Sequence, residues 1–174
     1  LAEAGYEATQ DRWTLIFARD LRHPPEKVWA ALTEPRQLAA WAPYTADRDL
    51  STAGGATITM IDDEKPEDIA VEVLRADRPT LLEYSFGTDL LRWDLAATGT
   101  GTRLTLRHTV IDRDWIPKVA AGWHICLDVA ETLLEGRPIP PIRGAAAMDF
   151  GWPELNDRYA QKFGIPNTGA PDSP

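Results

Sequence analysis

One segment near the C-terminus constrains the fold more than any other part of the chain. Residues 116–136 read IPKVAAGWHICLDVAETLLEG, with apolar residues recurring three and four positions apart. This spacing places them along one side of a long α-helix, and Gly136 followed by Pro138 supplies the residues that end it. Because a helix with one long apolar side must cover another apolar surface, the rest of the chain has to provide a matching face.

The preceding residues predict that face as a series of short strands. Residues 12–21 form the first strand. The pair Pro24-Pro25 opens one short helix, and Pro35 opens a second that reaches Trp41. Further strand-length runs surround Ile58, Val71 and Tyr84 or span 90–97 and 102–110. We therefore predict an α+β helix-grip domain, a curved antiparallel sheet of about six strands around the long C-terminal helix.

The same pass along the chain divides it into four parts. Residues 1–11 are predicted to be an N-terminal lead, 12–138 the helix-grip domain, 139–164 a C-terminal extension with a short helix, and 165–174 a disordered tail. The extension carries an apolar stripe of Trp152, Leu155, Tyr159 and Phe163. This stripe has to dock on its own domain, which we favour, or on a second copy, so both a monomer and a homodimer are compatible with it.

Composition narrows the classes of partner. A formal net charge of −9, with lysine and arginine scattered along the chain, argues against nucleic acid. Cys126 is the single cysteine, so the chain has no internal disulfide and gives no sign of an oxidising compartment. No stretch approaches the ~20 apolar residues of a membrane span. We therefore expect a cytoplasmic protein that neither binds nucleic acid nor inserts into a membrane.

Three motifs carry a resemblance to a known family. They are PPEKVWAALTEPRQLAAW after the first strand, the strand LTLRHTV, and AGWHICLDVAETLLEGRP in the long helix. Together they resemble the START-like, or Bet v 1-like, helix-grip superfamily, and within it the branch named for the Hsp90 ATPase activator homologue. The resemblance covers about residues 12–138. The segment GWPELNDRYAQKFG resembles a C-terminal extension of many bacterial members.

The resemblance implies a deep cavity between sheet and long helix, used in the family for lipids, polyketides or other apolar ligands. Since the family includes binders, cyclases, hydrolases and chaperone regulators, the fold does not decide the activity. Binding of a small hydrophobic molecule is our leading hypothesis. The alternatives are a cyclase or aromatase-like enzyme and an Hsp90-type chaperone regulator. The sequence given shows no additional N-terminal domain like that of eukaryotic activators, so we expect no Hsp90 binding.

Aromatic and aliphatic residues on the facing elements are the candidates for lining such a cavity. Alternation along residues 104–110 turns His108 inward with its apolar neighbours and leaves Arg103 and Arg107 for solvent. Trp41 and Tyr44 are expected to frame an entrance. The predicted ligand-binding residues are Tyr84, Phe86, Trp93, Leu95, Leu106, His108, Trp123 and Leu127.

The polar residues leave catalysis unassigned. His108 could act with Tyr84 in proton transfer, or it could be a hydrogen-bonded core histidine. His124 aligns with Asp128, Glu131 and Glu135 in a polar stripe that should face solvent or the sheet edge, although a rotated helix would make His124 and Asp128 a base and its orienter. The histidines and the cysteine lack metal-ligand spacing, and we expect neither a metal nor a cofactor.

Overall fold

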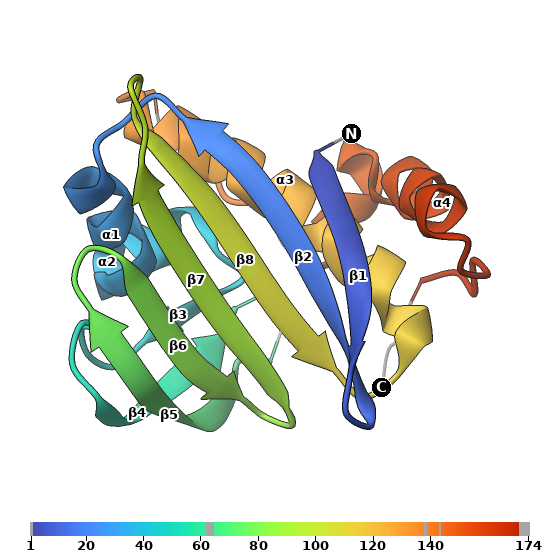
Figure 1. Ribbon diagram of the computed structural model, residues 1–174, viewed down its shortest axis with the longest axis horizontal. Coiled ribbons are helices and arrows are strands. Elements are labelled where there is room, and N and C mark those ends of the chain that lie inside the picture. Colours follow the sequence, from blue (N-terminus) through green and yellow to red (C-terminus); the bar gives the residue numbers. More distant parts are fainter. Residues whose placement is uncertain (1, 62–64, 138, 143, 171–174) are drawn as a thin grey trace.

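The computed structural model describes residues 2–61, 65–137, 139–142 and 144–170. Its centre is one antiparallel sheet with the order β1-β2-β8-β7-β6-β5-β4-β3 (Figure 1). The strands are β1 Glu3–Thr9, β2 Arg12–Leu21, β3 Tyr44–Ala46, β4 Gly54–Met60, β5 Glu67–Asp77, β6 Leu81–Phe86, β7 Asp89–Ala97 and β8 Thr102–Val110. The α-helices are α1 Pro25–Thr33, α2 Pro35–Trp41, α3 Ile116–Leu134 and α4 Trp152–Phe163, with 3-10 turns at Arg113–Trp115 and Gly144–Phe150.

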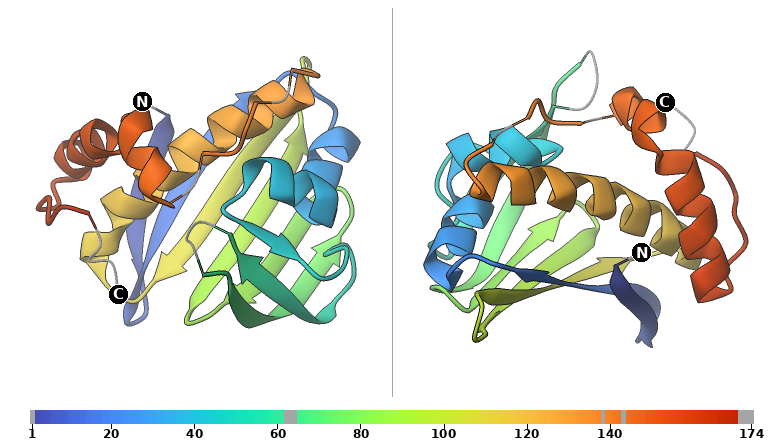
Figure 2. Two further views of the ribbon diagram at one scale, coloured as in Figure 1. Left: turned by 180° about the vertical axis from the view of Figure 1, so that it is seen from behind. Right: turned by 90° about the horizontal axis from the view of Figure 1, so that it is seen from above.

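The sheet curves around α3, which lies along its concave face, and α1 and α2 cover one end of the same face (Figure 2). This arrangement confirms the predicted α+β helix-grip fold. The sheet has eight strands where the sequence indicated about six. One additional strand, β1, lies within the predicted N-terminal lead, and the other, β3, has only three residues. Both are edge strands, and edge strands carry weaker apolar patterns than central ones.

Strand register places the inward-facing residues in rows across the sheet. Tyr84, Leu91, His108 and Leu15 pair in one row, and Leu82, Trp93, Leu106 and Phe17 pair in the next. Residues that are paired in this way point to the same face of a sheet. All eight are buried, whereas Arg103 and Arg107 on the opposite face are partly exposed. The predicted inward orientation of His108 is confirmed.

Two glycines are required where the sheet meets the chain leading to α1 and where α3 ends. A Cβ on Gly101, in the β7–β8 turn, would lie 2.1 Å from the Leu21 carbonyl oxygen, so only glycine lets these segments meet. Gly136 has a φ of 77° just after α3, as predicted for a left-handed cap. The Lys27 ammonium donates to the Leu134 carbonyl at 2.5 Å and satisfies part of the helix end. Pro138 lies outside the described residues.

Helix α4 docks on its own chain. It packs against α3 beside β1 (Figure 2). Tyr159 is fully buried and Trp152 nearly so. Tyr159 stacks on Phe163 with ring centroids 5.7 Å apart, and Phe163 meets Tyr6 of β1 edge to face. The apolar stripe of the extension is thus covered in cis. In the described part of the chain, no helix is long and apolar enough to cross a membrane.

Candidate functional site

Five aromatic side chains fill the space between the sheet and α3, and we call them the aromatic cluster: Trp41, Tyr44, Tyr84, Trp93 and Trp123. Trp93 on β7 and Trp123 on α3 meet edge to face with centroids 5.3 Å apart, and Trp41 of α2 lies 6.3 Å from Trp93. Each member is at most 6% exposed. Edge-to-face rings form an apolar wall of defined shape, which suits either a packed core or a flat ligand.

The indole N–H groups of the cluster differ in their partners. Trp41 donates to the Ala31 carbonyl at 2.8 Å, and Trp123 donates to His108 Nδ1 at 3.0 Å. The Trp93 N–H is also buried, and within the described parts of the chain it meets no acceptor at full hydrogen-bond geometry. Its neighbour is the Tyr84 hydroxyl, and a hydrogen bond from the Trp93 side chain lowers the pKa of that phenol, opposing the larger effect of burial. The Trp93 donor is thus held less firmly than those of Trp41 and Trp123.

Tyr44 and Tyr84 form a hydrogen-bonded pair of phenols with 2.5 Å between the two oxygens. Burial raises the pKa of Tyr84 to about 12. Burial, followed by the neighbouring Tyr84, raises the pKa of Tyr44 well above its ordinary value. Both phenols therefore stay protonated near neutral pH. One hydroxyl donates to the other, so the accepting tyrosine keeps its own hydrogen for a further acceptor.

His108 is held at both ring nitrogens. Nδ1 accepts the Trp123 N–H, so the imidazole proton resides on Nε2, which lies 2.8 Å from Asp89 Oδ2. A chain of Asp89, His108 and Trp123 thus runs from the start of β7 through β8 to α3. Since neither nitrogen is left to meet a substrate, the geometry favours the hydrogen-bonded core histidine over a role in proton transfer.

The remaining predicted lining residues are spread along the same interior. Leu95, Leu106 and Leu127 are buried, and Phe86 is partly exposed with its ring 5.2 Å from that of Tyr44. Trp41 and Tyr44 are each 1% exposed. The expectation that these two frame an entrance is therefore wrong, because α2 and β3 fold them into the cluster and away from solvent.

A second group of interacting side chains lies where β2, α3 and α4 meet, and we call it the polar cluster: Arg19, His124, Asp128, Glu131 and Tyr159. Arg19 Nη1 contacts Asp128 at 2.8 Å and Glu131 at 3.6 Å. The Tyr159 hydroxyl lies 2.8 Å from His124 Nδ1 and accepts the Ala2 N–H at 3.2 Å. His124 Nε2 is 3.7 Å from Asp128. The polar stripe of α3 thus faces the sheet edge, one of the two orientations predicted.

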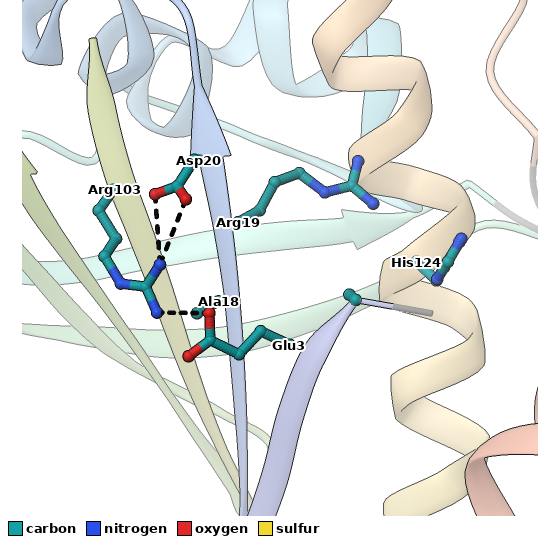
Figure 3. Close-up of a pocket in the computed structure, with 7 residues that line it drawn as sticks. Glu3, Ala18, Arg19, Asp20, Arg103 and His124 are labelled. Carbon is teal, nitrogen blue, oxygen red and sulfur yellow. Dashed lines mark hydrogen bonds and ion pairs between the residues drawn. The ribbon is translucent and has the colours of Figure 1, made fainter. Parts of the chain in front are cut away.

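Beside the polar cluster is an open pocket of about 380 Å³. It is lined by Ala2, Glu3, Ala18, Arg19, Asp20, Arg103 and His124. Figure 3 shows Arg103 held between Asp20 and Glu3 on one side, and Arg19 and His124 on the other. Each arginine already has carboxylate partners, which lowers its value for an external anion. Burial lowers the pKa of His124 despite the nearby Asp128.

Sequence reasoning missed Arg19, Asp89 and Tyr159 as members of these networks. Arg19 alternates with Leu15 and Phe17 along β2, so the strand period alone indicated that it faces inward. Asp89 gave no such signal, because its contact with His108 depends on the register of β7 and β8. Among the described residues, no three His, Cys, Asp or Glu side chains gather in a way that would hold a metal ion.

Comparisons with known proteins relate this chain to a protein family. The family model described as Activator of Hsp90 ATPase homolog 1-like protein matches residues 22–135. That range runs from the end of β2 to the end of α3 and so includes the whole aromatic cluster. A search of curated proteins finds no match.

Solved structures share the fold at low sequence identity. CalU16 from Micromonospora echinospora is 20% identical, with a TM-score of 0.68 over 92% of this chain and 96% of its own. A conserved protein of unknown function from Enterococcus faecalis is 16% identical, with a TM-score of 0.70 over 92% and 90%. A protein from Aeromonas hydrophila that is like the activator homologue is 19% identical, with a TM-score of 0.60 over 71% and 92%. Because the family model spans more than half of the sequence, the chain belongs to the Activator of Hsp90 ATPase homolog 1-like family.

Proposed function

We propose that this protein binds a small hydrophobic molecule between the sheet and α3, against the aromatic cluster. The observation that carries the proposal is the aromatic cluster itself, five buried rings from α2, β3, β6, β7 and α3 that meet between the sheet and the long helix. Such rings supply a large apolar surface of defined shape, which is what a pocket for a small hydrophobic molecule requires. The position agrees with the interior that the START-like resemblance implies for ligands.

Binding here requires a conformational change. The cluster rings are in mutual contact and nearly without solvent exposure, so a ligand has to displace a side chain or move α3 away from the sheet. The ligand therefore selects a more open state, and its observed affinity is reduced by the rarity of that state. Leu95, Leu106, Leu127 and Phe86 would complete the apolar lining in that state.

The other two hypotheses have less support. A cyclase mechanism needs a group that exchanges protons with the substrate, and His108 has both nitrogens engaged by Trp123 and Asp89. Regulation of a chaperone ATPase rests on the family name alone. Reversible ligand binding needs only the apolar wall that the aromatic cluster forms.

Native mass spectrometry of the purified protein beside a denatured control tests the proposal, together with thermal shifts in the presence of naphthalene derivatives. Trp93→Phe should weaken binding, because it removes the donor and part of the wall. Trp29→Phe is the matched control, since Trp29 is equally buried and its N–H is also unpaired, but it lies on α1 outside the cluster. Binding that is absent in the wild type, or equally reduced in both variants, would overturn the proposal.

A further inference from the structure

The two edges of the sheet are covered to different extents, and the less covered one is an interaction surface. We propose that the outer edge of β1 pairs with the same edge of a second copy of this chain, so that two eight-stranded sheets join across a two-fold axis. This edge lies on the side of the sheet away from α1 and α2 (Figure 1). The proposal does not depend on the ligand site.

The opposite edge of the sheet is covered. Strand β3 has only three residues, so part of β4 has no strand beside it. The Arg48 guanidinium lies there and donates to the carbonyls of Gly54 and Gly55, each at 3.0 Å. Asp47 exchanges two hydrogen bonds with Thr57 in the same stretch. Such coverings are common in natural sheets, because a bare edge pairs readily with other strands.

The β1 edge is bare over most of its length. The two-residue turn after Thr9 makes the residues on its two sides a hydrogen-bonded pair, so Thr9 and every second residue before it bond to β2. The residues between them, Ala4, Tyr6 and Ala8, direct their N–H and C=O groups outward. Within the described parts of the chain, no hydrogen bond reaches these outward groups.

Helix α4 covers the first residue of this edge and so sets the length that is free. The Tyr159 hydroxyl accepts the Ala2 N–H at 3.2 Å, and the Lys162 ammonium donates to the Ala2 carbonyl at 3.2 Å. Ala2 therefore has no backbone group to offer a second strand. The free part runs over residues 4–8, and we call it the open edge. Its pairing with β2 is continuous, without a bulge that would twist it away.

One register of two β1 strands uses the whole open edge of both copies. A two-fold axis perpendicular to the sheet makes the paired strands antiparallel and gives both copies the same contacts. Centring the pair on Tyr6 places Ala4 opposite Ala8 of the second copy. Each pair of outward-facing residues then exchanges both of its backbone hydrogen bonds. We call this pairing the central register.

The two glutamates of β1 favour the same register. Glu3 and Glu7 lie on the convex face of the sheet. In the central register, Glu3 faces Thr9 of the second copy and Glu7 faces Gly5. A slip by two residues in one direction sets Glu3 opposite Glu7, and a slip in the other direction sets Glu7 opposite itself. Because like charges directly opposite each other are destabilising, both slipped registers are disfavoured.

Gly5 allows a test that leaves the backbone pairing intact. A Cβ at Gly5 would meet nothing within 4 Å, and its φ is not positive, so a side chain fits there. In the central register Gly5 faces Glu7 of the other copy in both symmetric pairs. Gly5→Lys should therefore tighten the dimer by about fivefold, and the matched variant Gly5→Glu should weaken it by a similar factor.

Sedimentation equilibrium over micromolar to millimolar concentrations measures the dissociation constant of each protein. The unfolding of both Gly5 variants is measured at the lowest concentration, where the monomer prevails, so that an effect on the fold is separated from association. High salt should reduce the difference between the two variants, because it screens exposed charges.

Ala8→Pro removes an outward N–H from the open edge. Proline is tolerated on an edge strand where its missing N–H faces solvent, so the pairing of β1 with β2 should remain. We expect this variant to be monomeric. Amide hydrogen exchange gives a second readout: the amides of Ala4, Tyr6 and Ala8 should become protected as the concentration of the wild type rises, whereas those of Gly5 and Glu7 should be protected throughout.

The other outcomes contradict the proposal. A wild type that stays monomeric up to millimolar concentration has no such interface. A dimer in which the amides of Ala4, Tyr6 and Ala8 exchange as fast as in the monomer pairs through another surface. If Gly5→Lys weakens the dimer, two lysines face each other and the central register is wrong. Should Ala8→Pro fail to fold, the two Gly5 variants and the exchange pattern still decide between these outcomes.

Discussion

Two histidines of this protein have the same arrangement of partners in different surroundings. His108 accepts an N–H from Trp123 at Nδ1 and faces Asp89 at Nε2, and His124 has the Tyr159 hydroxyl at Nδ1 and Asp128 near Nε2. The first lies between the sheet and α3 at 6% exposure, and the second lies at the junction of β2, α3 and α4 beside an open pocket.

The comparison indicates that the surroundings of a histidine, and not the types of its partners, determine how much it contributes to stability. His108 orients a tryptophan inside the aromatic cluster, where every partner lost is a buried polar group left unpaired. His124 joins the C-terminal extension to α3 at a place that water can reach, where lost contacts are partly replaced by solvent. The same substitution should therefore cost more stability at the first site than at the second.

The largest expected effect is that of His108→Ala. It leaves the Trp123 N–H and the Asp89 carboxylate without their partner and opens a void in the core, so the free energy of unfolding should fall by about 3 kcal/mol. Urea denaturation followed by tryptophan fluorescence measures it. His108→Gln, which keeps an acceptor and a donor, should recover part of the loss. A cost below about 1 kcal/mol for His108→Ala would show that the network is not tightly formed.

A smaller effect is expected for Tyr159→Phe. The ring keeps its stacking on Phe163 and its contact with Phe17, but the hydrogen bonds to Ala2 and His124 are lost. We expect a loss of about 1 kcal/mol, together with faster amide exchange in α4 and β1 than in β7 and β8. Equally faster exchange across the whole sheet would mean that the polar cluster stabilises the whole domain and not specifically the packing of α4 and β1.

The sequence was sufficient to predict the helices and strands whose apolar residues recur at a clear helical or strand spacing. The long helix, the two short proline-initiated helices and the central strands lie where apolar spacing placed them, and alternation alone oriented His108. The edge strand β1 was not found, because EAGYEAT contains two glutamates and a glycine and one of its faces meets solvent. Its strand character comes from pairing with β2, which no local pattern encodes.

The candidate site was harder to predict, because its contacts join distant positions. Arg19 and Asp128 are 109 residues apart, and their ion pair depends on where α3 crosses β2. The partners of the buried indoles are likewise a property of packing: Trp41 meets a backbone carbonyl, Trp123 meets His108 and Trp93 meets the Tyr84 hydroxyl, and nothing in the sequence separates the three. Residue types identified the aromatic residues of the interior, but only their three-dimensional placement shows which acceptor each indole N–H meets.

A modest effect is expected for Arg19→Met. The methionine keeps the apolar stem but removes the contacts with Asp128 and Glu131, so stability should fall by about 0.5–1 kcal/mol, less at high salt. Arg75→Met is the matched control, since Arg75 pairs with Asp77 on the exposed surface. Its cost should be near zero. Equal costs for the two variants would place Arg19 among ordinary surface ion pairs despite its 12% side-chain exposure.

The smallest effect is a difference in pH dependence between the wild type and His124→Gln. Burial lowers the pKa of His124 below its ordinary 6.5, with Arg19 and Arg158 acting in the same direction and Asp128 opposing them. The unfolded chain therefore takes up this proton first, and stability should fall as pH decreases through about 6.5. Glutamine can still accept from Tyr159 but does not titrate, and the carboxylates common to both proteins cancel. Urea denaturation between about pH 7.5 and 5.5 should show the steeper loss in the wild type. If the wild type instead gains stability relative to His124→Gln on acidification, the attraction of Asp128 outweighs burial, and the polar cluster is a charged junction that tightens in acid.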